Sequence, residues 1–235
     1  MDFITSSLHR FYRAAQRRHP DILFHGDESC RQIALTFDDG PHPRDTPLVL
    51  AALEKHNVQA TFHLVGKSVE RHPRLIKEIH QRGHQLALHC YRHVPFPLER
   101  ASTLRTQLGH TRNIIASACG LLPEVIKDLR PPYGAFTART LSLFMEWGYR
   151  LVMWNSIPPH WMQPFSWSVR QMHDSIIPGA VIALHDGHGH GARVAEMVDV
   201  VVPRAKLLGF EFVTVEIMQN QREQLAASVS RGDGL

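Results

Sequence analysis

Short apolar segments rich in β-forming residues alternate with longer segments of helical periodicity along almost the whole chain. Short apolar runs bounded by turn residues are typical of buried strands, whereas apolar residues three or four apart are typical of amphipathic helices. We predict strands over residues 32–37, 60–65, 85–89, 125–129, 149–154, 180–184 and 211–215. We predict helices over residues 46–55, 73–82, 98–119, 137–147, 168–176 and 193–208. This alternation builds βαβ units and a parallel sheet, either doubly wound or closed into a barrel.

The chain is long enough to bury one sizeable core, because 43% of its 235 residues are hydrophobic. We expect one α/β domain at residues 30–217. Residues 1–29 precede the first predicted strand and are expected to form an N-terminal arm. Residues 218–235 are expected to form a polar, poorly ordered C-terminal tail.

The charge balance gives little support to nucleic-acid binding. The chain has 26 basic and 22 acidic residues, and its formal charge of +4 is not gathered in one basic run. We therefore expect no nucleic-acid partner. The 17 histidines are more informative than the net charge, because imidazoles gain a proton in mild acid. We therefore expect solubility and activity to respond to mild acid.

The cysteines and the N-terminal segment bear on location. Cys30, Cys90 and Cys119 form no C-x-x-C pair and leave an odd thiol, which is not typical of a disulfide framework. No segment has the apolar core of a signal peptide, and none has the length of a transmembrane span. We expect a cytoplasmic protein, or an extracytoplasmic one if an export signal has been removed.

Polar residues that can carry chemistry stand at the ends of the predicted strands. An α/β barrel collects its functional residues at the carboxyl ends of its strands, so this placement favours a barrel over an open sheet. The residues at or just beyond these ends are Asp38, Asp39, His89, Arg130, Asn155 and His185.

Two of these segments could together hold a metal ion. Taken alone, Asp38-Asp39-Gly40 is typical of a turn, but two carboxylates at a strand end can serve as metal ligand and general base. His89 and His93 are four residues apart and can converge on one cation, although such a pair could be coincidental among so many histidines. Two imidazoles and one carboxylate leave a fourth position for water, which is the composition of a catalytic zinc site.

Two further segments have both a structural and a functional interpretation. Arg130 precedes two prolines that fix the backbone, which suits a rigid surface turn. The same rigidity suits a site where the guanidinium orients a carboxylate and a backbone N–H faces a developing oxyanion. His185 begins His-Asp-Gly after a strand, and is either a solvated loop histidine or a general acid.

Four motifs occur in a characteristic order: TFDDGP from residue 36, H-x-x-x-H from His89, RPPYG from Arg130, and the Leu-His end of AVIALH. In this order they resemble the polysaccharide deacetylase family, which includes chitooligosaccharide and peptidoglycan N-deacetylases. The resemblance covers roughly residues 32–215 and marks residues 30–217 as the catalytic unit. It implies a distorted, incomplete TIM-like (β/α) barrel and metal-dependent hydrolysis of acetyl groups on N-acetylated sugars.

The resemblance also implies a role for each motif residue. A divalent metal, expected to be zinc, would hold the water that attacks the N-acetyl amide. By motif position the roles are metal ligation by Asp39, His89 and His93, general base for Asp38, orientation of that base by Arg130, oxyanion binding by the backbone N–H of Tyr133, and general acid for His185.

The sequence departs from the family at two places. The family's Asp-x-x-Asp-Trp motif, whose acid tethers the arginine, aligns with residues 157–161, where both acids are missing and Trp161 remains. Cys90 stands where the family has Ser or Thr. We therefore expect Arg130 to contact Asp38 and to find its second partner in a backbone carbonyl, a water or a carboxylate outside 157–161, since a buried guanidinium without partners is costly.

The expected substrate is a short glycan that contains N-acetylglucosamine. Aromatic rings can pack on the apolar faces of sugars, and Trp161 is the best candidate because it lies in a Pro-rich loop at the expected mouth of the barrel. Trp154 and Trp167 are weaker candidates that can equally be packing residues. Pro132 and Tyr133 complete the expected substrate-binding set.

Two other functions fit the same residues. The first is a related amidase or O-acetyl esterase acting on another acylated molecule. The second is a non-catalytic carbohydrate-binding protein, in which the cleft binds sugar without turning it over. The changed loop at residues 157–161 motivates both alternatives.

Overall fold

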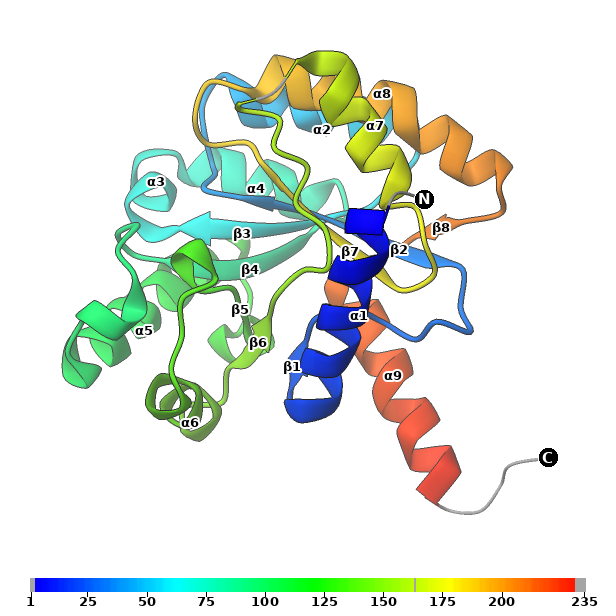
Figure 1. The fold of residues 1–235 in the computed structure, drawn as a ribbon. Helices are drawn as coiled ribbons and strands as arrows, with labels where there is room; N and C mark the ends of the chain where they lie inside the picture. Colours follow the sequence, from blue (N-terminus) through cyan, green and yellow to red (C-terminus); the bar gives the residue numbers. More distant parts are fainter. Residues whose placement is uncertain (1–2, 163, 231–235) are drawn as a thin grey trace.

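The computed structural model describes residues 3–162 and 164–230. In this part of the chain, eight parallel strands form one strongly curled sheet (Figure 1). Their order is β1-β6-β5-β4-β3-β2-β7, and β8 pairs with β2 beside this path. The strands are β1 (Ile22–Leu23), β2 (Gln32–Asp38), β3 (Thr61–Val65), β4 (Gln85–Cys90), β5 (Asp128–Leu129), β6 (Arg150–Val152), β7 (Ala180–His185) and β8 (Glu211–Phe212).

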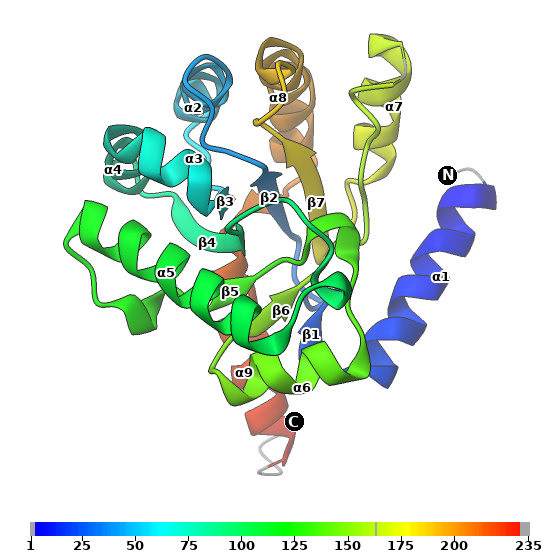
Figure 2. The same cartoon turned by 90° about the vertical axis from the view of Figure 1, so that its left-hand side faces the viewer.

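Most of the helices lie around the outer side of the curled sheet, as Figure 2 shows. Helices α2 and α8 pack side by side over β2 and β7 (Figure 1). The helices are α1 (Phe3–Arg18), α2 (Asp45–Lys55), α3 (Gly66–Arg71), α4 (Pro73–Gln81), α5 (Ala101–Cys119), α6 (Ala138–Glu146), α7 (Phe165–Asp174), α8 (Gly191–Leu207) and α9 (Val215–Ser230).

Strand β2 lies between β3 and β7 and is buried on both faces. Because successive side chains of a strand point to opposite faces, Leu35 and Phe37 pack in the main core, whereas Ala34 packs in a smaller apolar cluster with β1, β6 and β7. Thr36 and Asp38 continue the face of Ala34 toward the carboxyl end of the strand. The polar part of that face therefore lies where the chain leaves the sheet.

The sheet curls far enough that the chain after β6 reaches β7. Ser156 forms a single parallel bridge with Ile182, and the side chain of Asn155 accepts a hydrogen bond of 2.8 Å from the backbone N–H of Val181. Asn155 therefore helps to close the curl. The predicted distorted, incomplete barrel is confirmed, because this contact does not extend into a full strand pair.

Several elements differ from the sequence prediction. The expected arm contains β1, which pairs with β6, so the boundary at residue 30 cuts through the sheet. The expected tail is largely the helix α9, whose Met218 is buried. Helix α3 was not predicted, and β8 is shorter than the predicted strand at 211–215. Residues 1–2 of the arm and 231–235 of the tail lie outside the described residues.

Among the described helices, none combines the length and the apolar character that a bilayer span requires.

Candidate active site

The two aspartates at the end of β2 point in different directions because the backbone turns between them. Asp38 is the last residue of the strand, and Asp39 has a left-handed backbone with φ of 73°. Such a conformation is uncommon for a residue with a side chain and marks a position that the surroundings hold in place. Gly187 supports it from the loop after β7, where an added Cβ would lie 2.5 Å from the Cβ of Asp39.

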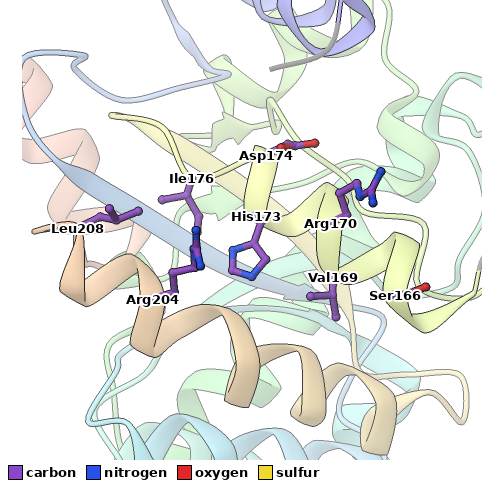
Figure 3. Close-up of a pocket in the computed structure, with 8 residues that line it drawn as sticks. All are labelled: Ser166, Val169, Arg170, His173, Asp174, Ile176, Arg204 and Leu208. Atoms are coloured by element: carbon purple, nitrogen blue, oxygen red, sulfur yellow. The ribbon is translucent and has the colours of Figure 1, made fainter.

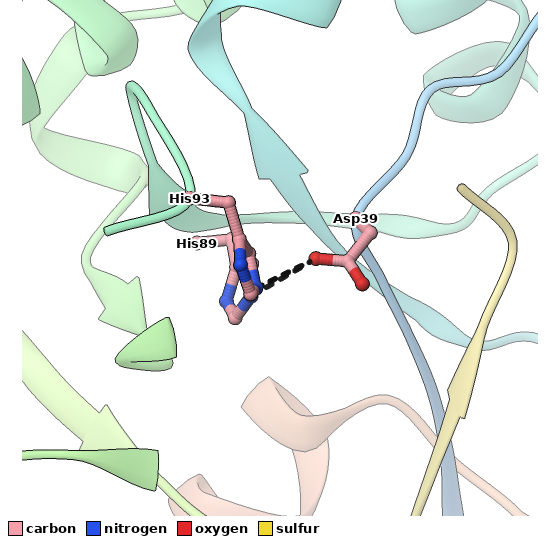
Figure 4. A group of neighbouring side chains, drawn as sticks. All are labelled: Asp39, His89 and His93. Atoms are coloured by element: carbon pink, nitrogen blue, oxygen red, sulfur yellow. Dashed lines mark ion pairs between the residues drawn. The ribbon is translucent and has the colours of Figure 1, made fainter. Parts of the chain in front are cut away.

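Asp39, His89 and His93 converge as the sequence predicts (Figure 4). The Nε2 atoms of His89 and His93 lie 3.3 and 3.1 Å from Oδ1 of Asp39. His89 donates its other ring N–H, on Nδ1, to the backbone carbonyl of Arg130 at 2.8 Å, which leaves Nε2 free to bind a cation. The three donor atoms all lie within 4.8 Å of one another, so one ion can contact all of them.

The ionisation of Asp39 suits metal binding. Burial alone would raise the pKa of Asp39, but hydrogen bonds and charges from His89 and His93 outweigh burial and lower it below its usual range. The carboxylate is therefore ionised. Two imidazoles and one carboxylate are a donor set that zinc accepts, and three protein ligands leave a position open.

Asp38 lies beside the Asp39, His89 and His93 cluster but has different charged neighbours. Its Oδ1 accepts a hydrogen bond of 2.8 Å from Nη1 of Arg130 and lies 3.2 Å from Nδ1 of His63. Burial raises the pKa of Asp38, but Arg130 and His63 lower it well below its usual range, so this carboxylate is ionised. Burial, with a contribution from Arg130, lowers the pKa of His63 to about 3, so its ring is neutral.

Arg130 is completely buried, and each of its three side-chain nitrogens donates at least one hydrogen bond. Its Nη2 donates to the carbonyl of Met153 at 2.8 Å and its Nε to the carbonyl of Val152 at 3.2 Å. Nη1 also donates to the hydroxyl of Thr36 at 2.6 Å. Arg130 thus contacts Asp38 and has its other partners outside residues 157–161, as expected; of the three kinds of partner that were expected, backbone carbonyls at the end of β6 take this place.

The RPPYG turn places its residues unevenly around the site. Tyr133 has a left-handed backbone with φ of 58°, is 69% exposed, and sets its ring edge-on to His93 at a centroid distance of 4.6 Å. Pro132 is buried and does not line the cavity, where Pro131 stands instead. The inclusion of Pro132 in the substrate-binding set is not supported by this placement.

A cavity of about 620 Å³ joins these groups. His185 lies on its wall, with the ring of Trp161 edge-on at 5.0 Å. Trp154 also lines the cavity, whereas Trp167 is not among the lining residues. The full lining is Asp38, Asp39, His89, His93, Pro131, Tyr133, Trp154, Ile157, His160, Trp161, His185, His188 and His190.

Four histidines at the site were not among the predicted site residues. His63 follows from sheet register, since it is paired with Asp38 across β2 and β3. The spacing His185-x-x-His188-x-His190 is a visible signal that the loop after β7 returns to the cavity, and Nε2 of His188 lies 3.0 Å from Oδ2 of Asp39. His160 is buried beside His185. The cavity therefore has more imidazoles than the motifs require.

A second cavity, of about 510 Å³, lies between α7 and α8 (Figure 3). It is lined by Ser166, Val169, Arg170, His173, Asp174, Ile176, Arg204 and Leu208. None of the predicted site residues lines it.

Comparison with known proteins gives a consistent result. The family model for polysaccharide deacetylase matches residues 25–152, more than half of the chain. The chain is 32% identical over 206 residues to the peptidoglycan-N-acetylglucosamine deacetylase of Bacillus cereus, covering 86% of this chain and 73% of that protein. It is 36% identical over 161 residues to the chitooligosaccharide deacetylase of Rhizobium leguminosarum bv. trifolii, covering 67% of this chain and 72% of that protein.

The fold agrees with the sequence comparison. The crystal structure of the Bc1960 peptidoglycan N-acetylglucosamine deacetylase in complex with 4-naphthalen-1-yl-N-oxidanyl-benzamide superposes with a TM-score of 0.79 at 31% identity. The match covers 84% of this chain and 92% of that one. With motifs, curled parallel sheet and Asp-His-His cluster in agreement, the chain belongs to the polysaccharide deacetylase family.

Proposed function

We propose that the protein is a metal-dependent deacetylase that hydrolyses the N-acetyl amide of glycans containing N-acetylglucosamine. The observation that carries the proposal is the pair of differently held carboxylates at the end of β2. Asp39 is aimed at two imidazoles, and Asp38 is kept ionised by Arg130 without joining the metal cluster. One carboxylate is thus available to bind a cation and the other to accept a proton.

A divalent cation, which we propose to be zinc, would be held by Asp39, His89 and His93 and would lower the pKa of a bound water. Asp38 is placed to accept a proton from an attacking water, and Arg130 keeps the carboxylate facing the cavity. The backbone N–H of Tyr133 donates to the oxygen of the acetyl group as negative charge develops there. His185, when protonated on both ring nitrogens, then gives its Nε2 proton to the departing amine and is left as the neutral Nδ1–H ring.

We propose that a sugar ring of the substrate packs against the side chain of Trp161. It is 39% exposed at the cavity, so a sugar ring can reach its face. Trp161→Ala is expected to lower turnover of a chitooligosaccharide more than turnover of a small acetate ester. Trp167→Ala is the matched control, because Trp167 is equally exposed but does not line the cavity. An equal loss on both substrates would make Trp161 a packing residue.

Acetate release tests the proposal as a whole. Zinc-loaded protein is incubated with a panel of N-acetylated and O-acetylated sugars, and released acetate is measured by mass spectrometry. Acetate from the N-acetylated sugars alone supports the proposal. Release only from the O-acetylated sugars would assign an esterase, and tight binding of chitooligosaccharide without any release would assign a non-catalytic carbohydrate-binding protein.

A further inference from the structure

His160 occupies an unusual position beside the proposed general acid. It stands in the loop between β6 and α7, where the family motif has an acid, and its residue surface is completely buried. The rings of Trp161, His185 and His190 surround it at centroid distances of 4.9, 5.2 and 6.2 Å. It makes no contact with Arg130 in the described structure, so it does not replace the acid that tethers the arginine.

The hydrogen bonding of His160 determines which of its nitrogens carries the proton. Nδ1 lies 3.0 Å from the carbonyl oxygen of Pro158. A carbonyl only accepts, so Nδ1 is the protonated nitrogen and donates to it. Burial, together with the charge of His185, lowers the pKa of His160 to about 4, so the ring is neutral. Nε2 is therefore a bare acceptor.

Neither Nε2 of His160 nor Nδ1 of His185 has a hydrogen-bond partner among the described residues, and both atoms are buried. A buried polar atom without a hydrogen-bond partner destabilises the folded state. The two atoms belong to neighbouring rings tilted by 37°. If Nδ1 of His185 carries a hydrogen, each nitrogen is the partner that the other lacks.

The ring separation fits an edge-to-edge contact. A ring nitrogen lies about 1 Å from its ring centroid and an N–H···N bond spans about 2.9 Å, so bonded imidazoles have centroids about 5 Å apart. The observed separation is 5.2 Å. With these two ring edges facing each other, the nitrogens therefore come within bonding distance.

We propose that His160 is a positioning residue whose Nε2 accepts a hydrogen bond from Nδ1–H of His185. The bond fixes the tautomer and the orientation of His185 and leaves its Nε2 to face the cavity. In other proteins a carboxylate or a backbone carbonyl commonly accepts the hydrogen bond that orients a histidine. Here the neutral imidazole of His160 takes that role. Only the role of His185 as acid rests on the proposed function; the pairing itself does not.

Nitrogen NMR of the imidazoles tests the pairing directly. Protein labelled with 15N-histidine is measured at a pH where both rings are neutral, first without metal and then with zinc added. The wild type is expected to show His185 as the Nδ1–H tautomer. His160→Leu removes the acceptor and is expected to shift His185 toward the Nε2–H form, whereas His160→Gln, which keeps an acceptor, restores the Nδ1–H signal.

His173→Leu, in the second cavity, is the matched control and leaves the His185 signals unchanged. An Nε2–H tautomer in the wild type would overturn the proposal even if His160→Leu does not fold, as would an unchanged tautomer in a folded His160→Leu.

Turnover gives the second readout. With an N-acetylated chitooligosaccharide, His160→Leu is expected to lower kcat about 10–100-fold with KM little changed, and His160→Gln to recover most of it. A kcat equal to wild type in folded His160→Leu would contradict the positioning role. Absence of turnover in the wild type would refute the proposed function, while the NMR result would still decide the pairing.

Discussion

Two adjacent aspartates differ in chemistry because their neighbours differ. The guanidinium of Arg130 holds Asp38, and the imidazoles of His89 and His93 surround Asp39. Neither carboxylate can take over the other's surroundings, because the left-handed backbone at Asp39 turns the two side chains apart.

Asp38→Asn is expected to lower kcat by about 100-fold to 10,000-fold, since a general base of this kind contributes that much. Its zinc content is expected to stay near that of the wild type, because the residue does not belong to the Asp-His-His cluster. Asp39→Asn is expected to lose zinc. Kinetics and metal analysis of both variants check this, and loss of zinc in Asp38→Asn with retention in Asp39→Asn would exchange the two roles.

The elements that brought the site together differ in how well the sequence predicts them. β2 and β7 are continuous apolar runs, and they were predicted to within one residue. β5 has only two residues and β8 only two, so their pairing depends on the neighbouring strand rather than on their own pattern. β1 follows a polar helix, and its apolar pair is too short to indicate a strand.

The residues of the site likewise differ in how well the sequence predicts them. The metal ligands lie within two short motifs, so their convergence could be expected from strand ends alone. His63 reaches Asp38 only through the register of β3 against β2, and the carbonyls that hold Arg130 are backbone atoms that no side-chain motif displays. His160 is far from His185 in sequence, and only the near-closure of the sheet brings the two together.

The loop between β7 and α8 is packed against the metal cluster at Gly187. An added Cβ there would meet the Cβ and the backbone oxygen of Asp39 at 2.5 Å, and backbone cannot move aside cheaply. Gly187→Ala is therefore expected to weaken zinc binding about 10-fold or more and to lower turnover with it. Isothermal titration with zinc measures the change.

The matched control for this prediction is Gly109→Ala, in the middle of α5, where an added Cβ meets nothing within 4 Å. It is expected to leave zinc binding unchanged and to raise the free energy of unfolding by about 0.5–1 kcal/mol through helix propensity. Zinc affinity equal to wild type in Gly187→Ala would show that the loop does not constrain Asp39.

Strand β1 and the first turn of α9 meet at the apolar part of the sheet. Leu23 of β1 and Met218 of α9 share one buried cluster with Val152 of β6. Leu23→Ala is expected to lower the free energy of unfolding by about 2–5 kcal/mol, as for other buried leucines. Leu122→Ala, at a 72% exposed leucine, is expected to stay within about 0.5 kcal/mol of wild type. Denaturant titration decides, and equal effects would mean that the N-terminal segment is dispensable.

Buried histidines make the stability of the whole molecule depend on pH. Burial lowers the pKa of His84 to about 4, and Nδ1 of this ring accepts the backbone N–H of Ala60 at 3.2 Å, so the folded state needs it neutral. His63 and His160 are likewise neutral when folded, whereas each of them titrates near 6.5 in the unfolded chain. The unfolded state therefore binds more protons between about pH 6.5 and pH 4.

Because the pKa values of these buried histidines are lower in the folded state, their contribution to stability is fully present above about pH 6.5. This contribution is lost as the pH falls toward 4. Burial raises the pKa of Asp186 to about 7, and Asp39 and Asp38 raise the pKa of His89 against the effect of burial, so these two groups work in the opposite direction and offset part of the loss. Five imidazoles with a lowered pKa against these two groups leave a net fall in the free energy of unfolding on acidification; the five are His63, His84, His160, His173 and His185. His84→Asn keeps a hydrogen-bond acceptor for Ala60 but has no titrating ring. The free energy of unfolding of this variant is therefore expected to fall less than that of the wild type over this pH range, by on the order of 2 kcal/mol. Denaturant titrations at pH 7 and pH 4.5 measure both slopes, and parallel slopes for variant and wild type would show that His84 is already charged in the folded protein.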